Sequence, residues 1–116
     1  MEQPGNTSTS SVVVPVITRD DYQIGLEFVE NHFLFCHVAV SGPTTRRTLA
    51  SLRADFDRLA SLVGRPLFGL EPEAASEQPK FAKFAALMGF HPFQRVECAS
   101  GPPRMVYTRR NEPWAA

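Results

Sequence analysis

Five side chains of the types that bind zinc occur in the sequence, but they do not form the pattern of a zinc site. Structural zinc sites combine two closely spaced pairs of cysteine or histidine ligands. The residues available do not pair in this way: His32, Cys36, His37, His91 and Cys98. Motifs typical of serine hydrolases, phosphate-binding loops and dinucleotide-binding folds are also absent. We therefore expect no metal site and none of these common catalytic motifs.

Arginines provide two places where an anion could bind. Arg46 and Arg47 stand near the predicted start of a long helix, where they could hold a phosphate or simply form a solvated helix face. A second group surrounds the last predicted strand: Arg104, Arg109 and Arg110, with Tyr107 and Trp114 nearby. Twelve basic and twelve acidic residues give a net charge of zero, however. Without a global positive field, nucleic-acid binding is not expected.

The length and composition indicate one small globular domain. The chain has 116 residues, of which 43% are hydrophobic, so a single core is possible. No run approaches the roughly 20 apolar residues that span a bilayer, and the first residues lack the features of a secretory signal. Cys36 and Cys98 are expected to be buried thiols. These features favour a location inside the cell.

The first half of the chain predicts three strands and a long helix. The β-branched run 12–17 contains Pro15 and is typical of an edge strand. Apolar and polar residues alternate over 22–28, which favours a strand over the competing helix at 21–32. A further strand follows at 34–40. The long helix carries an apolar stripe: Leu49, Leu52, Phe56, Leu59 and Val63.

The second half adds one helix and three strands. The run 66–70 is a short buried strand, and a helix with Phe81, Phe84, Ala85 and Met88 on one face ends at Gly89. Strands at 93–98 and 104–108 complete the order β-β-β-α-β-α-β-β. The fold class is α/β (α+β), a mixed sheet with a parallel pair between 34–40 and 66–70. The two helices are expected on opposite faces. The chain divides into an arm at 1–11, one domain at 12–110 and a tail at 111–116.

This element order over residues 22–109 resembles the C-terminal two-thirds of the GNAT acyltransferase superfamily. The segment Lys80-Phe81-Ala82-Lys83-Phe84-Ala85-Ala86-Leu87-Met88-Gly89-Phe90 is similar to the family's late helix, which ends in Gly-Phe before a strand. The resemblance implies a GNAT-like fold with an acyl-CoA site at the N-terminus of the long helix.

The loop that would bind the pyrophosphate departs from the family pattern. In the family, glycines let successive backbone N–H groups approach the anion. Here the loop reads Ser41-Gly42-Pro43-Thr44-Thr45-Arg46-Arg47-Thr48-Leu49-Ala50, without the paired glycines, and Pro43 removes one donor. The resemblance leaves Arg46 and Arg47 as the candidates for holding acyl-CoA pyrophosphate or another anion.

The catalytic positions that the resemblance implies also differ. The tyrosine that commonly serves as general acid falls on Ala85, whose methyl group cannot protonate a thiolate. The upstream asparagine falls on Gln78, and the small residue between them on Phe81. Glu27 and His37 remain as candidates for a general base. Before residue 22 the sequence shows one strand and an arm, so the two front helices of the family have no counterpart here.

These departures favour a non-catalytic GNAT-like domain that acts as a protein-interaction or structural component and uses no cofactor. Truncated, glycine-poor versions of this fold resemble small proteins encoded by tailed bacteriophages, some of which are virion components. This resemblance suggests a phage origin and a place in the virion. The alternative is a minimal acyl-CoA-dependent N-acetyltransferase with acetyl-CoA as cosubstrate, and a third possibility is a regulatory module that binds acyl-CoA. The expected contacts are the arm 1–11, the edge strand 12–17 and the Trp114 tail, which would lie on neighbouring subunits.

Overall fold

The computed structural model of the protein describes residues 12–30, 32–99 and 101–110. The arm at 1–11 and the tail with Trp114 lie outside the described residues. The strands are β1 (Val13–Thr18), β2 (Tyr22–Val29), β3 (Phe33–Val40), β4 (Leu67–Leu70), β5 (His91–Val96) and β6 (Arg104–Arg109). The helices are α2 (Arg46–Val63), the short 3-10 helix η1 (Ala75–Glu77) and α3 (Gln78–Leu87). The predicted element order is confirmed, and β5 begins two residues earlier than predicted.

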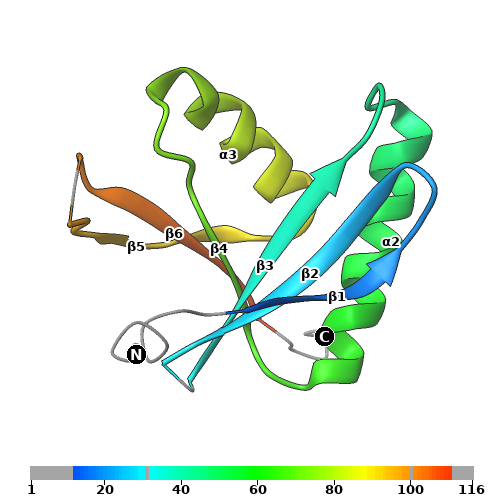
Figure 1. Ribbon diagram of the computed structural model, residues 1–116, viewed down its shortest axis with the longest axis horizontal. Coiled ribbons are helices and arrows are strands. Elements are labelled where there is room, and N and C mark those ends of the chain that lie inside the picture. The colour runs from blue at the N-terminus through cyan, green and yellow to red at the C-terminus, as the bar shows by residue number, and fades with distance from the viewer. Residues whose placement is uncertain (1–11, 31, 100, 111–116) are drawn as a thin grey trace, which may run out of the picture.

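The six strands form one mixed sheet in the order β1-β2-β3-β4-β6-β5. β2 pairs antiparallel with β3 along its whole length, so the helical alternative for this segment is wrong. β1 lies at the edge of the sheet as predicted, and a bulge between Pro15 and Ile17 interrupts its pairing with β2. The parallel pair of β3 and β4 is also confirmed, but it consists of two residue pairs, Leu34–Leu67 and Phe35–Phe68. Beyond these pairs the two strands diverge (Figure 1).

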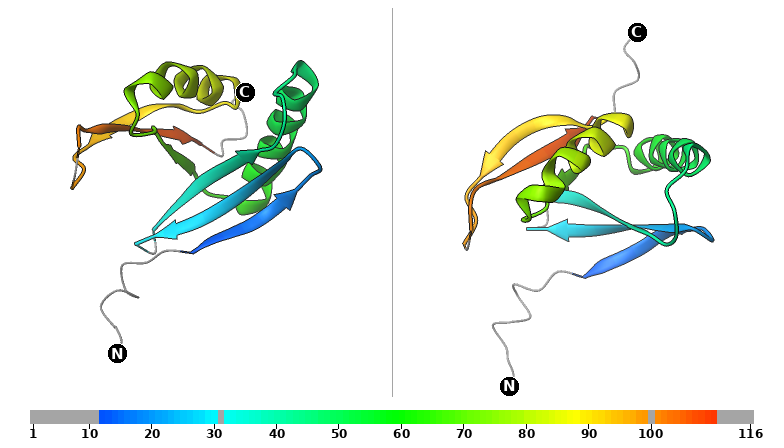
Figure 2. Two further views of the ribbon diagram at one scale, coloured as in Figure 1. Left: turned by 45° about the horizontal axis from the view of Figure 1, so that its top comes forward. Right: turned by 90° about the horizontal axis from the view of Figure 1, so that it is seen from above.

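Both helices pack on the same face of the sheet, so the expectation of opposite faces is wrong. The Arg53 guanidinium of α2 donates to the carbonyl of Leu87 at the end of α3, at 2.8 Å. The rings of Phe56 and Phe90 meet edge to face at 5.5 Å between centroids. Figure 2 shows the two helices next to each other, seen from above. The apolar stripes of both helices need partners, and packing against one another and a shared sheet face supplies them.

Local signals set the ends of α2. Thr45 is the N-cap, and its hydroxyl accepts a hydrogen bond from the Thr48 backbone N–H at 3.2 Å. Gly64 ends the helix in the left-handed conformation, with φ of 72°, which costs a glycine little. Between these caps, Leu52, Phe56 and Leu59 are buried as predicted, while Leu49 is half-buried.

A buried carboxylate joins the β1–β2 turn to α2. Asp55 is 1% exposed, and its oxygens accept hydrogen bonds from the Arg19 guanidinium (2.7 and 3.0 Å), Arg58 (2.6 Å) and the Tyr22 hydroxyl. The hydrogen bonds from Arg19, helped by those from Tyr22 and Arg58, outweigh burial and lower the pKa of Asp55 to about 2. The charged form of Asp55 is therefore the one that the fold stabilises.

We predict that Asp55→Asn destabilises the domain in a pH-dependent way. The pKa is lowered on folding, so the contribution is present above about pH 4 and is lost as the pH falls through about 2. At pH 7 the variant should lose on the order of 2 kcal/mol of unfolding free energy, and the difference should shrink at low pH. Urea titrations from pH 7 to pH 2 measure this. Asp20→Asn, at an exposed position, is the control, and a pH-independent loss at Asp55 would contradict the prediction.

Phe56 and Phe84 were both predicted to be buried, but only Phe56 is. Phe56 is 1% exposed, whereas Phe84 is half-buried because it faces a cavity. We therefore expect Phe56→Ala to cost about 3–5 kcal/mol of unfolding free energy. Phe84→Ala removes fewer packing contacts and should cost less than half as much. Denaturant titration of both variants tests this, and equal losses would show that Phe84 packs as a core residue.

Candidate functional site

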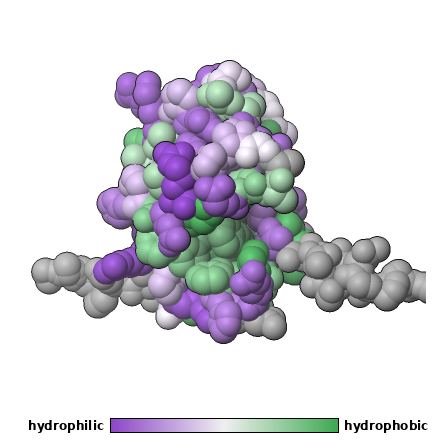
Figure 3. Space-filling view, turned by 90° about the vertical axis from the view of Figure 1, so that its left-hand side faces the viewer, coloured by the Kyte–Doolittle hydropathy of each residue, from purple (hydrophilic) through white to green (hydrophobic). Residues whose placement is uncertain are grey.

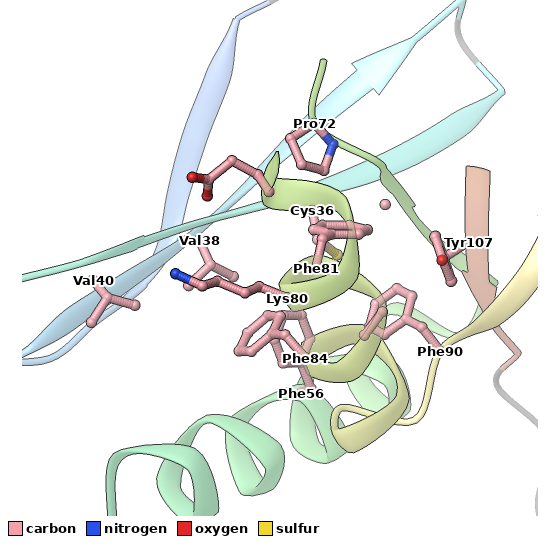
Figure 4. Close-up of a pocket in the computed structure, with 13 residues that line it drawn as sticks. Cys36, Val38, Val40, Phe56, Pro72, Lys80, Phe81, Phe84, Phe90 and Tyr107 are labelled. Atoms are coloured by element: carbon pink, nitrogen blue, oxygen red, sulfur yellow. The ribbon is translucent and has the colours of Figure 1, made fainter. Parts of the chain in front are cut away.

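A cavity of about 310 Å³ lies where β3 and β4 diverge, and α3 forms one of its walls. Figure 4 shows side chains from both helices and from β3 pointing into it. Most of the lining is aliphatic or aromatic. The residues are Cys36, Val38, Val40, Phe56, Gly69, Pro72, Glu77, Lys80, Phe81, Phe84, Ala85, Phe90 and Tyr107. A mostly apolar concave site with a few polar groups is typical of small-molecule pockets.

The groups that could do proton chemistry in the cavity are few. Burial raises the pKa of the Cys36 thiol to about 12, so it is almost entirely protonated at neutral pH and a poor nucleophile. Ala85 is buried in the wall and contributes only a methyl group. Tyr107 is buried, its ring packs on Phe81 at 5.4 Å, and its hydroxyl makes no hydrogen bond to the described part of the chain. Tyr107 is therefore the cavity residue whose hydroxyl could most readily act as a general acid.

Glu27 and His37, the candidate bases, are brought together but lie away from this cavity. His37 Nε2 is 2.7 Å from Glu27 Oε1, and both side chains are partly exposed. In the β2–β3 register, residues 22, 24 and 26 of β2 face the helices, so Glu27 and His37 point to the opposite side of the sheet. A base on that side of the sheet cannot act on a group bound in the cavity, which lies on the helix side.

Arg46 and Arg47 begin α2 and are both exposed. Neither lines the cavity between β3 and β4. Neither makes a hydrogen bond or ion pair with the described residues. The loop before them contains Gly42 with φ of 84°, and the Thr48 backbone N–H in the first turn of α2 is already bonded to the Thr45 hydroxyl. The two guanidinium groups are thus available to an anion.

The sheet face opposite the helices carries a cluster of aromatic side chains. Phe68 is at its centre, with ring centroids 5.4 Å from Phe33, 5.7 Å from Phe35 and 5.9 Å from Phe93. We call these four rings with Val96 and Val106 the aromatic face; together with Gln94 they line a hollow of about 240 Å³. Phe33 is 41% exposed and Phe93 56% exposed. The space-filling view shows an apolar hollow ringed by hydrophilic residues on the side to which the β5–β6 hairpin projects (Figure 3).

Most residues of the cavity and of the aromatic face lie in elements that the sequence predicts, but the sequence predicts neither site. Phe81, Phe84 and Ala85 belong to the predicted helix stripe, and Phe84 was expected to be largely buried in the core. The cavity exists because two strands part after two residue pairs, and no local pattern encodes that. The aromatic face could have been suspected from Phe33, Phe35 and Phe93 at alternate positions of predicted strands.

Comparisons with solved structures place this geometry in a known fold. An aminoglycoside 6'-acetyltransferase type Ii superposes with a TM-score of 0.60 at 16% identity, covering 90% of this chain and 72% of the other. A chimera of the spermidine N-acetyltransferase SpeG from Vibrio cholerae with hSSAT gives 0.55 at 12% identity, covering 78% of this chain and 59% of the other. A Bordetella pertussis protein assigned to the GNAT family of acetyltransferases gives 0.54 at 17% identity, covering 77% and 56%.

The chain has a GNAT fold. No protein-family model matches the sequence, and no curated protein sequence does so either. The chain spans between 56 and 72% of the length of the GNAT structures it resembles. At these identities the likeness concerns the fold, and the activities of those enzymes are not transferred by it.

Two further properties of this GNAT-like domain follow from the described residues. None of the helices in this part of the chain has the length and hydropathy of a membrane-spanning segment. Within residues 12–30, 32–99 and 101–110, no group of three or more His, Cys, Asp or Glu side chains could hold a metal ion.

Proposed function

We propose that this GNAT-fold domain is a non-catalytic interaction domain, and that its aromatic face binds a second copy of the chain. The observation that carries the proposal is the uncovered apolar surface on the sheet, where Phe33 is 41% exposed and Phe93 is 56% exposed. Contiguous apolar patches of a few hundred Å² on a soluble domain commonly mark interaction sites.

The chemistry of the cavity supports the non-catalytic part of the proposal. Ala85 provides no proton, and the Glu27–His37 pair points to the other side of the sheet. An acyl transfer needs an acid and a base held around one reacting centre. Among the described residues, Tyr107 is the one cavity side chain with a suitable hydroxyl, and the one cavity carboxylate, that of Glu77, makes no hydrogen bond with it.

A second copy suits the aromatic face for two reasons. The chain has no net charge, so two copies do not repel each other. The tail also starts close to this face, because Thr108 near the end of β6 pairs with Phe68. Trp114 stands five positions after Arg109, which allows its backbone a reach of about 17 Å. We propose that Trp114 of one copy packs on the aromatic face of the other.

The β1 edge of the sheet exposes further apolar side chains. Val13, Val14 and Val16 of β1 are each more than 40% exposed. Pro15 and the bulge after it hinder addition of another strand, because proline lacks an N–H and a bulge breaks the ladder. β1 would therefore contribute apolar side chains to an interface rather than backbone hydrogen bonds. A component of a larger protein assembly, such as a virion, would use the same surface.

We expect the full chain to form a dimer or larger oligomer by light scattering, and Phe93→Glu to return it to a monomer. A carboxylate at this position would be buried without a partner in the interface. Trp114→Ala should also weaken the association. The matched control is Leu62→Glu, since Leu62 is 78% exposed on α2, away from the aromatic face. A monomeric full chain, or equal effects of Phe93→Glu and Leu62→Glu, would contradict the proposal.

The second candidate function is a minimal acyl-CoA-dependent N-acetyltransferase. It is favoured by the cavity between β3 and β4 and by the β3 backbone beyond Phe35, which makes no further pairs with β4. An extended ligand with amide groups could bond to such a strand edge. Arg46 and Arg47 would then hold the pyrophosphate of acetyl-CoA.

Thermal melting with acetyl-CoA distinguishes the two candidates. Under the leading proposal acetyl-CoA leaves the melting temperature unchanged, and no acetyl group is transferred to amine acceptors. A ligand at 100 times its Kd stabilises by about 2.7 kcal/mol, a shift of several degrees at this size. A saturable shift that Arg46→Ala/Arg47→Ala abolishes and Arg95→Ala preserves would favour the acyltransferase instead.

A further inference from the structure

A row of four paired residues crosses the sheet from its β1 edge to the aromatic face. Val13 of β1 pairs with Glu27 of β2, which pairs with Phe35 of β3. Phe35 pairs in turn with Phe68 of β4. Directly paired residues point to the same side of a sheet, so these side chains are neighbours on the face opposite the helices. Three of the four are apolar, and Glu27 is the one that carries a charge.

Glu27 has one polar partner in the described part of the chain, the imidazole of His37. His37 Nε2 lies 2.7 Å from Glu27 Oε1, and it is the donor, because an ionised carboxylate only accepts hydrogen bonds. The Glu27 side chain is 23% exposed and that of His37 is 49% exposed. The ring can therefore take up a proton from solvent without losing this bond. Protonation changes the charge of the pair from one negative charge to none.

The described side chains that border the pair on this face carry no charge. Most are apolar, and Gln23 donates its amide to the Thr18 hydroxyl at 3.3 Å. They come from β1, β2 and β3, and they are Val13, Pro15, Gln23, Gly25, Phe35 and Ala39. Imidazole is the ordinary side chain that changes charge between pH 5 and 8. The net charge at this point of the face is therefore set by His37 over that range.

The proposed interface has apolar side chains on both sides of this pair. The aromatic face begins at Phe35 on one side of Glu27, and Val13, which is 44% exposed, lies on the other side. A stable interface covers about 800 Å² on each partner, so it extends well past two half-exposed rings. A second copy that covers both the aromatic face and the β1 edge also covers Glu27 and His37.

Covering the pair costs less free energy when His37 is protonated. With a neutral ring, the interface removes a net negative charge from water on each copy. With a protonated ring it removes a hydrogen-bonded ion pair that has no net charge, which is the less costly group to bury. Association is therefore linked to proton uptake. By linkage, the state that binds more protons is favoured as the pH falls, so the stabilisation of the dimer is present at low pH and is lost as the pH rises.

We propose that the Glu27–His37 pair makes the self-association of this domain pH-dependent, with the second copy bound more tightly at pH 5.5 than at pH 8. The inference rests on the proposed function, since it concerns how the second copy covers the aromatic face. Its direction is opposite to that of an effect of net charge. Protonation of the three histidines makes a chain of zero net charge positive, and positively charged copies repel each other.

Sedimentation equilibrium of the full chain at constant ionic strength, from pH 8 to pH 5.5, measures the Kd of the dimer. Each proton taken up lowers the Kd by up to tenfold per pH unit while the imidazole titrates, so we expect a fall of at least about tenfold over this range. A dimer whose Kd is constant or rises as the pH falls overturns the inference and leaves the proposed function standing. A monomer at every pH overturns both.

Two variants test the pair itself. Glu27→Gln should reverse the trend, because a protonated His37 then has no countercharge in the interface and association weakens as the pH falls. His37→Gln should give a Kd that does not change over this range, because Glu27 stays charged throughout. A pair with only a structural role would leave the sign of the trend unchanged, so a wild-type trend in Glu27→Gln overturns the inference.

The matched controls are His32→Gln and His91→Gln. Both histidines are exposed, and neither makes an ion pair with the described residues. Each of these variants should keep the wild-type trend, because a proton on either ring adds a charge that no carboxylate compensates. If either variant abolishes the trend while His37→Gln preserves it, the proton is taken up elsewhere and the assignment of the Glu27–His37 pair is wrong.

Discussion

The arrangement of this domain depends on the short parallel pairing between β3 and β4. Two residue pairs hold the parallel contact, and from Cys36 onward β3 follows β2 while β4 follows β6. The Phe56–Phe90 pair and the wall of α3 occupy the helix side of the opening. Buried aromatic rings cannot be compressed, so they keep the two halves of the sheet apart. The cavity is what remains between strands that no longer pair and helices that cannot come closer.

The same packing leaves the other face of the sheet uncovered. Both α2 and α3 pack on one side of the sheet and contact each other there. No described element therefore covers Phe33, Phe68 and Phe93 on the other side. The rings there stabilise one another by edge-to-face and tilted contacts, but Phe33 and Phe93 remain about half exposed to solvent. One domain thus has two apolar sites on opposite sides of the sheet, one lined by side chains of both helices and one formed by strands alone.

Polar interactions hold the two halves in place around these apolar sites. Asp55 gathers Arg19, Tyr22 and Arg58 at the β1–β2 end of α2, and Arg109 of β6 bonds to both Asp57 of α2 and the Met88 carbonyl after α3. The first group joins α2 to one half of the sheet, and the second joins it to the other. α2 is therefore the element through which the angle between the halves is maintained, and each contact is charge-assisted.

The sequence by itself determined the elements, their order and the fold class. Alternation at 22–28, the stripe from Leu49 to Val63 and Gly64 are local signals, and each one acts within a few residues. The resemblance from Lys80 to Phe90 also led correctly to the GNAT fold. Tertiary structure alone decided the rest: both helices lie on one face, and Phe84 borders a cavity. These outcomes depend on where two strands stop pairing and which apolar stripes meet, and such contacts join residues more than 30 positions apart, which no local pattern specifies.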